Sequence, residues 1–123
     1  MTDSILESIK DAAGIGTDDV AFDAELLLHI NTTFVILREI GVGPDTPFIV
    51  SDYSANWHDF VDDDNIIPMI KSYVALKVRV LFDPPTSSAY MNAIQESIKE
   101  YEWRLNVEVD KWQGGDEDGR VTN

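Results

Sequence analysis

The chain has 123 residues, with 23 acidic and 9 basic side chains, a net charge of −14, and a hydrophobic fraction of 44%. This fraction is enough for one ordinary core, and no stretch approaches the roughly 18 uncharged apolar residues of a membrane span. The acidity argues against sequence-reading DNA binding, because acidic surfaces gain no counterion-release energy from phosphates, and the absence of cysteine excludes disulfides and thiolate metal sites.

The first two helices are predicted from their end signals and apolar spacing. A capping box over residues 4–7 begins a short helix that ends at Gly14, and a loop follows to Asp19. A longer helix begins near Asp19 or Asp23 and ends at the Gly-Val-Gly-Pro sequence of residues 41–44. Its apolar residues recur at three- and four-residue steps: Phe22, Leu26, Ile30, Phe34, Leu37 and Ile40.

Further apolar residues widen this stripe on the second helix beyond one face: Leu27, Leu28, Val35 and Ile36. A helix with two apolar faces is expected to be buried on two sides. The second face therefore belongs either to the core or to a contact with a neighbouring subunit.

The middle of the chain contains short elements. Residues 47–50 are long enough for one extended segment but not for a sheet. A short helix over residues 54–61 is predicted to be capped by Ser54 and anchored by Trp57 and Phe60.

Two long helices complete the predicted fold. Three aspartates at residues 62–64 cap a helix over about residues 65–82, which is the least amphipathic segment and is therefore predicted to be the central core helix. A Pro-Pro pair ends it. A last helix runs from residues 86–88 to about Leu105, with one clean apolar stripe: Tyr90, Ile94, Ile98, Tyr101 and Leu105.

Beyond this helix, residues 107–109 are predicted to be extended, and residues 111–123 have the composition of a disordered, acidic tail. The predicted fold class is thus all-α: a small bundle of three long helices plus one or two short ones, with a short extended segment. The helical domain covers residues 3–110, and the tail covers residues 111–123.

Signals for chemistry are weak. His29 and His58 lack metal-ligand spacing, and no nucleophile or phosphate-loop motif is present. We therefore expect no catalytic residues, no cofactor and no metal site. An enzyme would need a pocket in which His29 or His58 meets a carboxylate.

Large aromatic residues are the candidate contact residues. Trp103 lies off the main apolar face of its helix, and Trp112 precedes the glycine- and acid-rich stretch of residues 114–119. Because large aromatics outside a core often anchor protein–protein contacts, the candidate interface consists of Trp57, Phe60, Trp103 and Trp112. Trp112 has an alternative role, as a lid folded back over the bundle.

Several stretches of the sequence carry a resemblance to a known family: residues 18–23 leading into His29-Ile30-Asn31, residues 41–44, and residues 73–88, closing at residues 102–106. Their order and spacing resemble those of the head–tail connector (adaptor) proteins of long-tailed bacteriophages, which are also described as DNA-packaging or head-completion proteins. The resemblance covers most of residues 3–110 and leaves the acidic tail outside it.

The resemblance implies a virion protein at the head–tail interface, present in the host cytoplasm during assembly. Its partners would be the portal protein, a stopper (head-completion) or tail protein, and further copies of itself in a ring with the portal's twelve-fold symmetry. DNA would pass through this ring without sequence-specific binding, and no membrane is implied. The family brings no catalytic residues and no cofactor.

A different class of function remains open. An acidic DNA mimic, or another protein-binding module, would occupy the DNA site of a partner. A mimic requires carboxylates concentrated on one face, whereas those of this sequence are spread among caps, loops and the tail.

Overall fold

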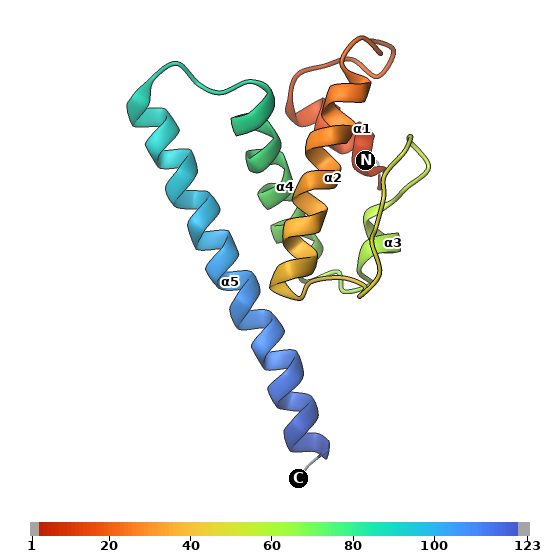
Figure 1. The fold of residues 1–123 in the computed structure, drawn as a ribbon, viewed down its shortest axis with the longest axis vertical. Helices are drawn as coiled ribbons and strands as arrows, with labels where there is room; N and C mark the ends of the chain where they lie inside the picture. The colour runs from red at the N-terminus through yellow and green to blue at the C-terminus, as the bar shows by residue number, and fades with distance from the viewer. Residues whose placement is uncertain (1–2, 121–123) are drawn as a thin grey trace.

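The computed structural model describes residues 3–120, with side chains described from Asp3 to Lys111. Within this part of the chain there are helices and loops but no strand (Figure 1). The elements in chain order are α1 (Ile5–Ala12), α2 (Asp23–Ile40), α3 (Trp57–Phe60), α4 (Ile67–Phe82) and α5 (Ser88–Arg120). The all-α prediction is confirmed, and residues 47–50 lie in a loop.

Helix α4 is the centre of the bundle, as predicted, and packs against α1, α2 and α5. Pro68 lies in its first turn, where the missing N–H removes no helical hydrogen bond. Its side chains at Ile70, Tyr73 and Val74 are completely buried. The helix ends at Asp83, before the two prolines that cannot continue its hydrogen bonds.

Helices α1 and α2 begin and end close to the predicted positions. The Ser4 hydroxyl accepts the N–H of Glu7 at 3.3 Å, and Gly14 follows the end of α1 with a φ of +76°. Helix α2 ends at Gly41, whose φ of +106° is left-handed and strongly favours glycine there. Local capping chemistry therefore accounts for the start of α1 and for the end of each helix.

Helix α3 is shorter than predicted, and its cap is different. Asn56 is the capping residue, and its backbone N–H donates to the carboxylate of Asp59 at 2.9 Å. The prediction that Ser54 caps this helix is wrong, because the Ser54 hydroxyl and N–H both donate to Asp52 two residues earlier. The predicted anchoring by Trp57 and Phe60 is confirmed, since both side chains are buried.

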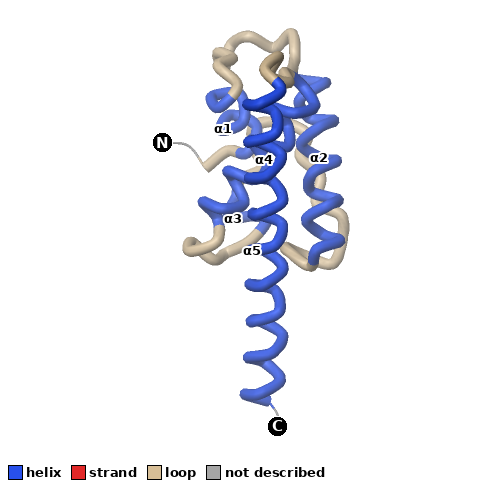
Figure 2. Tube along the Cα trace, turned by 90° about the vertical axis from the view of Figure 1, so that its left-hand side faces the viewer, coloured by secondary structure: helices blue, strands red, loops and turns tan. Residues whose placement is uncertain are grey.

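Helix α5 is longer than predicted. It begins after Ser87, whose hydroxyl accepts the N–H of Tyr90 at 3.2 Å, and it continues to Arg120. The prediction of an extended segment at residues 107–109 is wrong: Val109 continues the buried stripe and packs beside Gly41. The last turns extend past the rest of the bundle (Figure 2). The flexibility of residues 111–123 stays a prediction, and residues 121–123 lie outside the described part of the chain.

Candidate functional site

Two of the four candidate contact residues are core residues. Trp57 is 1% exposed and Phe60 is 4% exposed. The ring of Phe34 packs against both, with centroids 6.1 Å from Trp57 and 4.6 Å from Phe60. The indole N–H of Trp57 donates to the Ser8 hydroxyl at 3.1 Å, so its one polar atom is satisfied inside the fold. These two side chains hold α3 on the bundle and offer no free surface.

The other two candidates lie on α5. Trp103 is 66% exposed, which makes it one of the most exposed large apolar side chains of the described chain. Its neighbours one turn away on the helix are residues 99–100 and 106–107. The side chain of Trp112 lies outside the described residues, although its backbone belongs to α5. Trp103 therefore remains a candidate contact residue on the surface.

His58 joins two segments that the sequence reading did not connect. Its Nδ1 lies 2.9 Å from the carboxylate of Asp3, and its Nε2 lies 2.6 Å from that of Asp64. Hydrogen bonds to Asp64 and then Asp3 outweigh the opposing effect of desolvation and raise the pKa of His58 to about 9. The imidazole is thus protonated at neutral pH, where a protonated ring cannot act as a general base. It ties the N-terminal segment to the loop before α4.

His29 meets a carboxylate within its own helix. Its Nε2 lies 3.4 Å from Glu25, one turn earlier, and the pair lies near the solvent. Neither this pair nor the His58 cluster lines one of the hollows described below. Across the side chains that the structure describes, no group of three or more acidic or histidine residues is placed to hold a metal ion.

Lys10 is a structural residue that the sequence reading missed. Its side chain is fully buried, and its ammonium donates to the backbone carbonyls of Thr17 and Asp19, to the Asp23 carboxylate and to the Tyr53 hydroxyl. Burial disfavours the charge, but the hydrogen bonds to Asp23 and Tyr53 outweigh it and raise the pKa of Lys10.

This cation fixes the loop between α1 and α2. The one sequence signal that Lys10 is buried is its spacing, because it follows Leu6 by four residues on the apolar face of its helix.

The second apolar face of α2 is divided between core and solvent. Leu27 and Ile36 pack partly against the core, whereas Leu28 is 63% exposed and Val35 is 52% exposed. These two lie two turns apart, on the side of α2 that faces away from its buried residues. We define the α2 face as Glu25, Leu28, Thr32, Val35 and Glu39, which are all exposed.

A groove runs along the junction of α1 and α4. Two hollows of about 190 and 220 Å³ share Ile9, Ala12 and Ala75, and therefore adjoin. We define the α1/α4 groove by these three residues with Leu76 and Phe82 as its floor and with Lys71 and Arg79 at its edges. Asp83 lies at one end. The floor is apolar and the groove is open to solvent.

Further apolar side chains are exposed where the α1–α2 loop meets the end of α4. Val20 is 65% exposed and Leu81 is 47% exposed. Phe22, itself 44% exposed, packs edge-on against Phe82 with ring centroids 5.4 Å apart. The molecule thus has apolar contact area on several sides and no assembled catalytic cluster among its described residues.

The comparisons with known proteins give one match. The model of a family described as phage connector protein matches residues 5–112 of this chain. No curated protein and no solved structure matches it. Within the described residues, no helix is long and apolar enough to cross a membrane.

Proposed function

We propose that this chain, which belongs to the phage connector protein family, is a structural head–tail connector that forms a ring under the portal. The ring would extend the DNA channel and provide the docking site for the next head-completion, stopper or tail protein. The protein would act in the virion after assembly in the host cytoplasm, without catalysis. The observation that carries this proposal is the match over residues 5–112.

Exposed apolar surface on more than one side supports a role in assembly. Leu28 and Val35 lie on α2, and Trp103 lies on α5. Scattered apolar residues are ordinary on a monomer, but a connector needs separate contacts for its own copies, for the portal and for the next protein.

The end of α5 is the proposed contact with the portal. Val109 is the last buried residue among the side chains described up to Lys111, and beyond it the helix leaves the bundle (Figure 1). Deletion of residues 111–123 should therefore weaken portal binding while the helical fold and its unfolding temperature stay unchanged. Undiminished portal binding by the truncated chain would contradict this assignment.

The first experiment is the native mass of the purified protein, alone and mixed with the portal protein from the same genome. A ring, or a complex with about twelve copies per portal ring, would support the connector role. A chain that stays monomeric and does not bind the portal would overturn it. Circular dichroism on the same samples verifies that the chain is folded.

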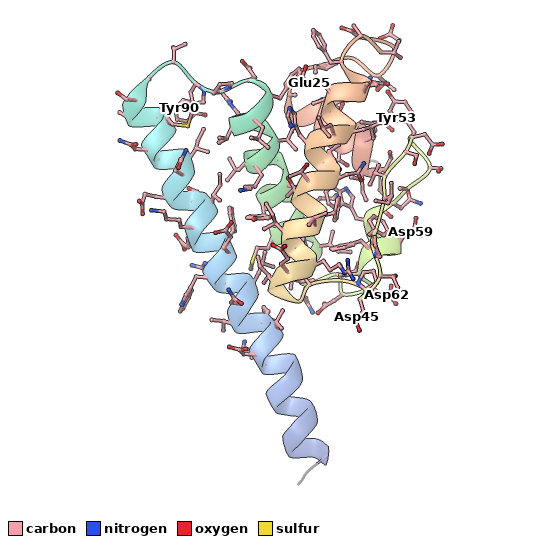
Figure 3. All side chains as sticks on the ribbon, in the orientation of Figure 1. Glu25, Asp45, Tyr53, Asp59, Asp62 and Tyr90 are labelled. Carbon is pink, nitrogen blue, oxygen red and sulfur yellow. The ribbon has the colours of Figure 1, made fainter. Side chains whose placement is uncertain are left out.

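An acidic DNA mimic is the second candidate, and one feature of the charge distribution favours it. Residues 39–70 contain seven acidic residues and no lysine or arginine. Three of them, Asp45, Asp59 and Asp62, lie on the same side of the bundle (Figure 3). A mimic would compete with DNA for a DNA-binding protein, whereas a channel wall would only repel DNA. Competition for a DNA-binding host enzyme, without portal binding, would favour the mimic.

A further inference from the structure

The α2 face and the α1/α4 groove lie on opposite sides of the bundle. Helix α2 packs on α4 through its buried side, so its exposed face points away from α4. The groove lies on the side of α4 that α1 partly covers. In Figure 2, helices α1 and α2 lie on either side of α4. The two surfaces can therefore contact different neighbours at the same time.

The two surfaces also differ in charge. Helix α4 carries Lys71, Lys77 and Arg79 and no acidic residue, in a chain whose net charge is −14. Lys71 and Arg79 edge the groove, and no described side chain forms an ion pair with either. The α2 face has apolar residues between two acidic ones, Glu25 and Glu39. An apolar surface with a carboxylate at each end thus matches an apolar groove that has two cations at its edges, although Asp83 lies at one end of the groove.

Glu25 and Arg79 also lie near the same end of the bundle. Arg79 lies over the ring of Tyr90 at 5.2 Å, and Figure 3 shows Tyr90 and Glu25 at the same end of the molecule. Rotation about a ring axis that runs along the bundle keeps each residue at its height. Glu25 of one copy would then meet Arg79 of the next.

We propose that the α2 face of one copy binds in the α1/α4 groove of the next copy, with Glu25 opposite Arg79. This inference rests on the proposed function, because it names the two surfaces that build the ring. The contact is heterologous, joining two different surfaces, and such a contact generates a ring when the rotation between neighbours closes. Neighbours in a ring of twelve differ in orientation by only about 30°, which requires the two surfaces to lie on nearly opposite sides, as they do here.

Charge reversal tests the pairing directly. Glu25→Arg and Arg79→Glu each place like charges across every contact, and should weaken self-association on the portal by about tenfold or more. The double variant restores opposite charges at each contact and should recover assembly. Glu96→Arg and Lys99→Glu make the same two changes on the exposed side of α5, and should leave assembly unchanged.

The readouts are native mass alone, copies bound per portal ring, and thermal unfolding to establish that every variant is folded. Wild-type assembly by folded single variants would overturn the inference and leave the connector role intact. A double variant that fails to recover would overturn the Glu25–Arg79 pairing. Loss of portal binding with normal self-association would assign the groove to the portal instead. Failure of the wild-type chain to bind the portal would overturn the connector role itself.

Discussion

Replacement of Gly43 by alanine should destabilise the fold through two separable effects. Gly43 has a φ of +88°, a conformation that side chains disfavour. A Cβ atom there would also lie 2.4 Å from two ring carbons of Phe60, which is far inside van der Waals contact. The ring has little room to move, because its centroid lies 4.6 Å from that of Phe34 and 5.1 Å from that of Phe48.

The magnitude follows from adding the two effects. A left-handed backbone costs a residue with a side chain about 1–2 kcal/mol. Overpacking a tight site costs a further ~1–3 kcal/mol, so the free energy of unfolding should fall by roughly 2–5 kcal/mol. Gly14→Ala is the matched control, since Gly14 has a φ of +76° and nothing within 4 Å of the added atom. Only the backbone effect applies there.

Urea unfolding followed by circular dichroism measures both variants against the wild type. The difference between Gly43→Ala and Gly14→Ala isolates the collision with Phe60 and should be about 1–3 kcal/mol. Adding Phe60→Leu to Gly43→Ala should then recover part of that difference. Equal losses in the two glycine variants would refute the reasoning, because they would show that Phe60 does not press on Gly43.

Three further changes test the polar contacts. Because its folded pKa is raised to about 9 from an ordinary 6.5, His58 contributes stability that is fully present below pH 6.5 and is lost as the pH rises through 9. The free energy of unfolding should fall across this range, and Asp64→Asn should flatten the slope; an unchanged slope would contradict the ion-pair account. Lys10→Met should raise amide hydrogen exchange in residues 14–22, because four oxygens lose their common donor, whereas the exposed Lys99→Met should not. Tyr73→Phe removes the 2.8 Å hydrogen bond to a carboxylate on α5 and should lower the free energy of unfolding, measured in urea, by about 1–2 kcal/mol. An unchanged urea midpoint would show that this hydrogen bond does not stabilise the fold.

The sequence predicts the helices well because their signals are local. The Ser4 cap, the left-handed stop at Gly41 and the Pro-Pro pair after α4 each act within a few residues. The alternating Val-Glu-Val of residues 107–109 resembles a strand, but the packing of Val109 beside Gly41 keeps it helical. Tertiary contact thus overrode local propensity there.

The candidate site could be predicted only in part, because its contacts span long distances in the chain. His58 and Asp3 are 55 residues apart, and Lys10 reaches Tyr53 across 43 residues. No spacing rule connects such pairs. The sequence does indicate the second apolar face of α2, since periodicity alone shows more apolar residues than one face can hold, but it cannot divide them between core and solvent.

The end of α2 supports α5 at the point where Val109 packs against Gly41. Val109 is the last buried residue among the side chains of α5 that the structure describes, and the Cβ of any residue at position 41 would lie 3.0 Å from it. Residues 110–120 continue as one helix, about 16 Å long at 1.5 Å per residue. A tilt of α5 by about 10° at this contact would move the far end of the helix by roughly 3 Å. The close packing of α5 on the end of α2 thus uses the space that a side chain at position 41 would fill.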